Sequence, residues 1–299
     1  MQESRLKNYL HLHFIIFIWG FTAILGALIS IDAIPLVWYR MLLASFFLIL
    51  FILVTKKNLK INKHTLLKFV LGGVVIALHW ITFFLAIKSS NVSIALITMS
   101  TGAFFASLIE PIFFKRRLSK LELFLGLIVV IGLYIIFQVE GEYLLGIIYG
   151  LISSFLSAVF SVANGLYVKK NNPIIISFYQ LFFGTLFITL LLFFTNQFSG
   201  DFFKVSTNDW IYLIILGSVC TAYAFSSSVK VMKVLSPYTV MLSINLEPIY
   251  GIILALIIFG DSEKMSPKFY IGALIILLSV ILNGLVKNRK QLLKRIQKK

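Results

Sequence analysis

The chain has 299 residues, of which 60% are hydrophobic and only 13% are charged. Soluble globular proteins carry about 45–50% apolar and about 25% charged residues. This composition therefore excludes a soluble enzyme, a nucleic-acid-binding protein and a disordered protein as descriptions of the whole chain. The mean hydropathy of +0.98 agrees, and the lone cysteine, Cys220, cannot form an internal disulfide. A polytopic helical membrane protein remains.

Ten apolar runs are long enough to cross a hydrocarbon core, for which about 20 residues are needed. The connections between them are mostly short, so neighbouring helices run antiparallel and no soluble domain fits between them. The first run lacks a clean small-residue cleavage site, and we expect it to be retained rather than removed as a signal peptide. The predicted spans are 10–30, 35–54, 67–87, 92–114, 121–139, 144–167, 173–194, 210–229, 237–259 and 269–286.

The positions of the basic residues orient the chain. With the N-terminus in the cytoplasm, the outside loops hold only Lys88, Lys204, Lys264 and Lys268 of the 27 Lys and Arg residues, and Arg40 falls within a span. This distribution follows the positive-inside rule. We therefore predict a multi-pass protein of the cytoplasmic membrane with both termini in the cytoplasm.

The net charge of +16 gathers mostly on that cytoplasmic face. The basic tail, residues 287–299, is either a stop signal that fixes the last span or a contact for anionic lipid headgroups. The basic residues are spread along one membrane face without interleaved aromatic residues. Nucleic acid is therefore not an expected partner.

The two halves of the sequence resemble each other. Residues 86–101 match residues 233–248, and the run at 35–40 resembles the run at 173–180. The Glu-Pro pairs at 110–111 and 247–248 look like a repeat marker, but their spacing breaks the other matches. Each half holds five spans, an odd number, so the second half is inserted upside down relative to the first.

We therefore predict an all-α fold of ten transmembrane helices, arranged as two inverted five-helix repeats. The first repeat covers residues 1–142 and the second covers residues 143–286, followed by the basic cytoplasmic tail. Inverted repeats are typical of secondary transporters, whose substrate sites lie near the membrane midplane at the repeat interface.

Glu247 lies about half way along the span 237–259, where a carboxylate costs about 2.5–3.5 kcal/mol. Thr239, Ser243, Glu247 and Tyr250 share one helical face, which we expect to line a wet cavity. Two interpretations stay open. Glu247 binds a substrate ammonium group or a coupling proton, or it is a protonated or hydrogen-bonded packing residue beside the hinge at Pro248.

Other spans also carry polar residues. Ser153, Ser157, Ser161 and Asn164 form a stripe along the sixth span, and Ser100 lies in the fourth. Small hydroxyl residues let helices approach closely, so packing is the alternative to a site. Asn164 is larger and is the better candidate to face a solute.

Histidine, aromatic and basic residues add further candidates. His79 and Trp80 can stack on or hydrogen-bond an organic substrate, and His79 either carries a proton or is a buried neutral histidine. Trp19 and Tyr223 are either cavity walls or lipid-facing bulk. Arg40 either attracts an anionic substrate group, pairs with a carboxylate, or snorkels outward.

No enzyme motif is present. The sequence contains no Walker loop, no HExxH helix and no GxSxG serine setting. We therefore expect no catalytic residue, no cofactor and no metal site.

Four segments carry a family resemblance: WGFTA at 19–23, PLVWYR at 35–40, AIKSSNVSIAL at 86–96, and the stretch 235–267 with its mid-helix LEP. They resemble the EamA branch of the drug/metabolite transporter superfamily over nearly the whole chain. The resemblance implies that the first, third, fourth, sixth, eighth and ninth spans surround a central cavity. It also implies alternating access, usually for export of amino acids or other small metabolites. Carried over, it places near the cavity Trp19, His79, Ser100, Asn164, Tyr223 and Glu247.

We expect a secondary transporter that exports a small organic metabolite, such as an amino acid or related compound, driven by protons or by exchange. One alternative is an intramembrane enzyme acting on a lipid, for which His79 near a serine is the only candidate pair. Another is a scaffold without a substrate, whose cavity would be filled with apolar side chains. The candidate substrate-binding residues are Glu247, His79, Trp80, Asn164, Tyr223, Trp19, Ser100, Tyr250 and Arg40.

Overall fold

The computed structural model of the chain is all-helical over the residues that it describes, which are all except 1, 116–119, 199 and 297–299. Eight helices in that part are long and apolar enough to cross a membrane, and two shorter apolar helices cover Phe124–Gln138 and Pro267–Ser279. Helices satisfy their own backbone hydrogen bonds, as a lipid environment requires. The chain is a multi-pass membrane protein.

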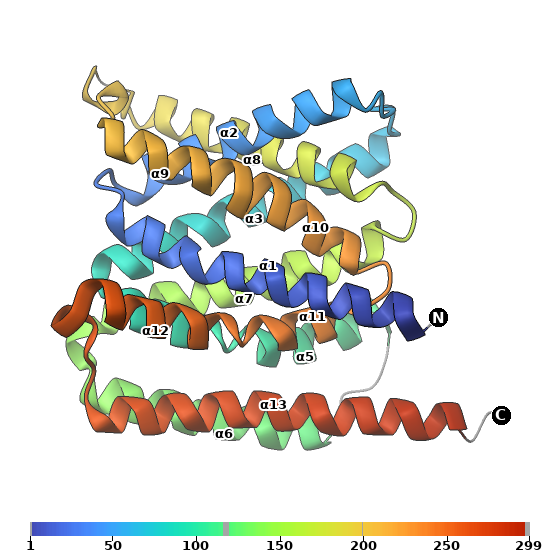
Figure 1. The fold of residues 1–299 in the computed structure, drawn as a ribbon, viewed down its shortest axis with the longest axis vertical. Helices are drawn as coiled ribbons and strands as arrows, with labels where there is room; N and C mark the ends of the chain where they lie inside the picture. Colours follow the sequence, from blue (N-terminus) through green and yellow to red (C-terminus); the bar gives the residue numbers. More distant parts are fainter. Residues whose placement is uncertain (1, 116–119, 199, 297–299) are drawn as a thin grey trace.

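The helices pack side by side in one bundle (Figure 1). The start of α1 and the end of α13 lie at the same end of it. The longer helices are α1 (Gln2–Leu28), α2 (Ala33–Val54), α3 (Lys63–Ser89), α6 (Lys120–Val139), α7 (Leu144–Tyr167), α8 (Pro173–Phe194) and α13 (Pro267–Ile296). The shorter ones are α4 (Val92–Met99), α5 (Gly102–Phe113), α9 (Thr207–Gly217), α10 (Ala224–Val231), α11 (Pro237–Ile244) and α12 (Glu247–Phe259).

Two predicted spans are broken near their middle, where the sequence predicted continuous helices. Ser100 and Thr101 separate α4 from α5, and Asn245 and Leu246 separate α11 from α12. At the first break the hydroxyl of Ser100 donates to the Ile97 carbonyl at 2.6 Å, which competes with the helical ladder. At the second, Pro248 has no N–H to offer the ladder. Both breaks leave irregular backbone at the depth of the membrane centre.

A further irregularity lies between α9 and α10, where residues Ser218–Tyr223 form a π-helix. The hydroxyl of Thr221 donates to the carbonyl of Leu216 at 2.6 Å, five residues earlier. A π-helix inserts one extra residue into a turn and shifts every following side chain around the helix. The side chains of this turn therefore do not follow the 3.6-residue period.

Two helix pairs meet through glycine. A Cβ on Gly73 of α3 would lie 2.4 Å from the Gln180 carbonyl oxygen of α8, and one on Gly184 would lie 2.8 Å from the Gly73 carbonyl oxygen. Gly132 and Gly272 meet in the same way where α6 packs on α13 at one edge of the bundle (Figure 1). Small residues at helix crossings are the usual means of close packing in membranes.

The end of the bundle opposite the start of α1 is closed by two carboxylates. Glu263, which follows α12, accepts hydrogen bonds from the backbone N–H of Val92 and Ser93, both at 2.9 Å. Asp209 at the start of α9 accepts from the N–H and hydroxyl of Ser30, at 2.8 and 2.6 Å. Each carboxylate joins a helix end of the second half of the chain to one of the first half.

The Gly73 crossing can be tested with Gly73→Ala. The added methyl group meets backbone, which cannot move aside as a side chain would, and overpacking of this kind costs about 1–3 kcal/mol. We expect a lower melting temperature for the purified protein in detergent. Gly141→Ala is the control, because nothing lies within 4 Å of a Cβ there. Equal melting temperatures for the two variants would contradict the crossing.

Candidate functional site

A cavity of about 60 Å³ lies in the middle of the bundle, between α1, α2, α3, α4, α7, α10, α11 and α12. This volume holds roughly four to six water molecules at 10–15 Å³ each. We call it the central cavity. Six of the nine predicted substrate-binding residues line it, namely Trp19, Arg40, His79, Trp80, Asn164 and Glu247.

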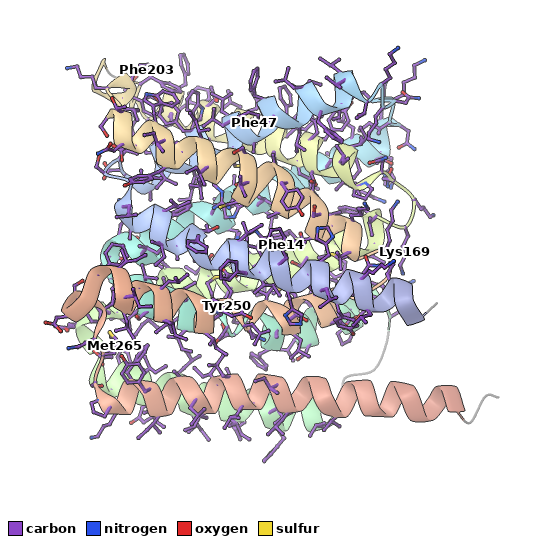
Figure 2. The ribbon with its side chains drawn as sticks, in the orientation of Figure 1. Phe14, Phe47, Lys169, Phe203, Tyr250 and Met265 are labelled. Atoms are coloured by element: carbon purple, nitrogen blue, oxygen red, sulfur yellow. The ribbon has the colours of Figure 1, made fainter. Side chains whose placement is uncertain are left out.

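The other three predicted residues lie outside this lining. Tyr223 is 43% exposed, and its hydroxyl pairs with His11 Nε2 at 3.0 Å. Ser100 is buried in the break between α4 and α5, where its hydroxyl is used by the backbone. Tyr250 lies between α1 and α12, with its ring 5.8 Å from that of Phe17 (Figure 2).

Arg40 is the most constrained charge of the cavity. Its side chain is only 1% exposed, so it does not snorkel outward. Its Nε donates to the hydroxyl of Thr221 at 2.7 Å, and its guanidinium carbon lies 4.0 Å from the centre of the Trp80 ring. Its Nη1 is buried and has no hydrogen-bond partner. One edge of the guanidinium is therefore left for a ligand or water.

The π-helix sets up these contacts. It brings the Thr221 hydroxyl to Arg40, and the carbonyl of Cys220 in the same turn accepts from Trp19 Nε1 at 3.1 Å. The sequence analysis missed Thr221 altogether, because a π-helix leaves no periodic signal in the sequence.

Glu247 is half-buried and faces the same cavity as Arg40. No carboxylate oxygen in the described part of the chain lies within 4.0 Å of the guanidinium, so the two residues are not a direct ion pair. Glu247 is the first residue of α12, where the positive end of the helix dipole favours a carboxylate. An acidic and a basic side chain thus share one cavity without a direct ion pair between them.

The predicted polar face of this span needs correction. Thr239 and Ser243 do not line the cavity with Glu247; Val240 and Ile244 do. The break between α11 and α12 resets the helical phase, so residues on its two sides no longer follow one face. Instead the hydroxyl of Ser243 donates to the carbonyl of Thr239 at 3.0 Å.

His79 is held by Ser153 of α7. Its Nδ1 lies 2.9 Å from the Ser153 carbonyl oxygen and 2.8 Å from the Ser153 hydroxyl, and that hydroxyl donates to the backbone carbonyl of His79 at 2.8 Å. A carbonyl only accepts, so we assign the proton to Nδ1. In neutral His79 the acceptor nitrogen is then Nε2.

Asn164 presents a second unpaired donor. Its Oδ1 accepts from Gln180 Nε2 at 2.7 Å, while its Nδ2 is buried without a partner. The Thr22 hydroxyl, which also lines the cavity, has no partner either. Buried polar atoms are normally hydrogen-bonded, so an orphaned one requires a water or ligand. Three such atoms, from Thr22, Arg40 and Asn164, converge on one cavity.

Metal chemistry has no evident ligand set. In the described part of the chain, no three His, Cys, Asp or Glu side chains gather closely enough to hold a metal ion. What the cavity offers is binding: donors from Arg40 and Asn164, an acceptor from Glu247, and aromatic walls that include Trp19 and Trp80.

Comparison with known proteins identifies the family. The family model described as "EamA-like transporter family" matches the chain twice, at residues 8–138 and 144–285. The chain belongs to the EamA-like transporter family. It is thus a membrane transporter, in agreement with the resemblance drawn from the sequence.

Individual relatives agree with the family. The chain is 21% identical over 226 residues to the uncharacterized transporter YdfC of Bacillus subtilis, covering 75% of this chain and 73% of that protein. It is 22% identical over 253 residues to an uncharacterized transporter of Clostridium kluyveri, covering 80% and 79%. A crystal structure with 16% identity superimposes with a TM-score of 0.68 over 94% of this chain and 98% of that one, which shows the fold alone.

Membership of this family removes the alternative of a lipid-modifying enzyme. The geometry of the only candidate pair agrees. His79 Nδ1 donates to a carbonyl and cannot also accept the Ser153 proton, and the Ser153 hydroxyl donates elsewhere. The serine is therefore not activated by a base.

The contact between Thr221 and Arg40 can be tested by Thr221→Val. Valine keeps the shape but leaves a buried guanidinium donor unpaired, and a hydrogen bond to a charged group contributes about 1.5–3 kcal/mol. We expect the melting temperature to fall in Thr221→Val and to be nearly retained in Thr221→Ser, which keeps the hydroxyl. Equal losses in the two variants would show that the hydroxyl is not what holds Arg40.

Proposed function

We propose that this EamA-family transporter moves a small organic metabolite, an amino acid or related compound, across the cytoplasmic membrane by alternating access. The direction is export, driven by proton coupling or by exchange. The observation that carries the proposal is the convergence of unpaired polar groups on the central cavity. Arg40 Nη1 and Asn164 Nδ2 lack acceptors there, and Glu247 faces the same space.

These groups suit a zwitterion. The two donors match the oxygens of a carboxylate, which guanidinium and amide groups bind well. The carboxylate of Glu247 matches an ammonium group, and the rings of Trp19 and Trp80 provide apolar contact for the body of the solute. A substrate-free scaffold would fill such a space with apolar side chains, which is not the case here.

The small volume of the central cavity favours a conformation of the transporter in which the cavity is too small for the solute. Its 60 Å³ is far below the ~300–1,000 Å³ of typical ligand pockets. The end of the bundle opposite the start of α1 is tied by Asp209 and Glu263. Access must therefore come by movement, and the two mid-span breaks supply places at which α5 and α12 can pivot against α4 and α11.

Several observations support ten spans in two inverted repeats, residues 1–142 and 143–286. The family model matches once in each half. α2 and α8 are both 22 residues long, and Arg40 and Gln180 hold the same place in them. α4 and α11 are both eight residues long and both precede a break. These lengths pair Ser100 with Asn245, two residues from the match read in the sequence.

The proposed topology places both termini in the cytoplasm. The start of α1 and the end of α13 lie at one end of the bundle, as an even number of spans requires (Figure 1). Contact of the basic tail with anionic headgroups stays part of the proposal, and the side chains of residues 287–299 lie outside those described.

Glu247→Gln tests the site, since it keeps the size of the side chain and removes its charge. We expect normal expression, and at least a tenfold loss of flux or a flux that no longer responds to pH, because the acid binds the ammonium group or the coupling proton. The measurement is uptake into proteoliposomes of labelled amino acids that first stabilise the wild-type protein in a thermal-shift screen.

Glu142→Gln is the matched control, since Glu142 is exposed and lies outside the cavity. Unchanged, pH-dependent flux in Glu247→Gln would remove Glu247 from the proposed site. Absence of flux in the wild-type protein for every solute that binds would count against transport of this class of compound.

A further inference from the structure

A second group of charges lies at the end of the bundle where α7 turns into α8 (Figure 2). Two open cavities of about 540 and 450 Å³ share Lys169, Lys170 and Asn171. The first also includes Lys233, after α10, and the second includes Lys68 of α3. We call this concave surface the lysine vestibule, defined by Lys68, Lys169, Lys170 and Lys233.

The charges of the vestibule are not neutralised by the protein. No carboxylate oxygen within the described ranges lies within 4.0 Å of any of the four ammonium groups, and all four side chains are exposed. The only ring contact given for them is that of Lys169, whose Nζ lies 4.9 Å from the centre of the Phe114 ring. Four like charges around one concavity repel each other, and an anion there relieves that repulsion.

The vestibule is built from the helices that line the central cavity. On α7, Asn164 lines the central cavity, and Lys169 lies in the turn just after the end of this helix. After α10, Met232 lines the central cavity and Lys233 lines the vestibule. On α3, His79 lines the central cavity, and Lys68, eleven residues earlier, lines the vestibule. The vestibule therefore lies at or just beyond the ends of helices that also line the central cavity.

We propose that the lysine vestibule binds the anionic group of the solute, a carboxylate, before that group passes to Arg40 in the central cavity. The inference rests on the proposed transport function and narrows it to solutes that carry a carboxylate. Clefts lined by one sign of charge raise the local concentration of oppositely charged solutes by 10–10³-fold. Asn164 Nδ2 and Arg40 Nη1 are the unpaired donors that the anionic group would then meet in the central cavity.

The test measures the charge that a probe meets in the vestibule. Asn171→Cys places a thiol on the surface shared by the two cavities, and the one native cysteine, Cys220, is only 2% exposed. The protein is held in nanodiscs of phosphatidylcholine and treated with an anionic (MTSES) or a cationic (MTSET) methanethiosulfonate. Each rate is divided by the rate of the same reagent with free mercaptoethanol.

We expect the anionic reagent to be favoured at least tenfold at 10 mM salt and hardly at all at 1 M, because the Debye length falls from about 30 to 3 Å. Lys169→Gln with Lys233→Gln should remove the preference. Lys56→Gln with Lys60→Gln, which lie at the same end but outside both cavities, should leave it unchanged. No preference, or a preference that survives loss of Lys169 and Lys233, would overturn the proposal.

Two further arms identify the source of the anion. Benzoate should protect the thiol from modification, and benzamide, which has the same shape without the charge, should not. Cardiolipin added to the nanodiscs should leave the protection by benzoate in place. If cardiolipin alone protects the thiol and benzoate then adds nothing, the site holds a lipid headgroup and the solute proposal fails. Flux into proteoliposomes is measured separately, so a failure of transport remains distinguishable from a failure of the vestibule.

Discussion

A guanidinium group buried at the centre of a membrane protein is the constraint on which the rest of this structure depends. Arg40 is 1% exposed, and a desolvated charge is tolerated only when other groups replace the water it has lost. Trp80 covers one face of the guanidinium, and the Thr221 hydroxyl accepts a hydrogen bond from its Nε. That hydroxyl is in position because the chain forms a π-helix there. The π-helix between α9 and α10 thus provides the hydrogen-bond acceptor for the guanidinium of Arg40 on α2.

The breaks and the tight crossings of the helices also bear on which parts of the bundle can move. Irregular backbone is costly in lipid and is kept only where it lines a cavity or is buried in protein. The breaks at Ser100 and Asn245 lie beside the cavity lined by Met99 and Glu247. By contrast, the helices are in close contact at Gly73 and Gly132, where an added Cβ would lie 2.4 and 2.7 Å from atoms of the neighbouring helix. The fold therefore combines tightly packed helix pairs with helices that are interrupted near their middle, a combination that suits the proposed alternating access.

The all-helical, multi-pass membrane character could be predicted from the sequence, since long apolar runs report directly on helices that can cross a membrane, of which the described residues form eight. The family was also readable, and so was the association of Arg40, His79, Asn164 and Glu247, because polar residues in hydrocarbon are rare enough to be informative. Thr221 and the polar face of α11 were not readable. Both depend on departures from the 3.6-residue period, a π-helix in one case and a break in the other. The π-helix has no local signature in the sequence, whereas Pro248 marks a hinge but does not tell how far the helical phase shifts across it.

The charges of the central cavity lead to one last step. Arg40 and Glu247 carry opposite charges, face the same space and make no direct ion pair within the described residues. Had they met, each would have satisfied the other, and a solute would have had to break a buried pair, which costs several kcal/mol. Arg40 is held by Thr221, and Glu247 is held at the start of α12, so both side chains can still bind a further group. In the proposed function, a solute with a carboxylate at one end and an ammonium group at the other would pair with both side chains at once. The separation of Arg40 and Glu247 is therefore the feature on which the proposed site depends.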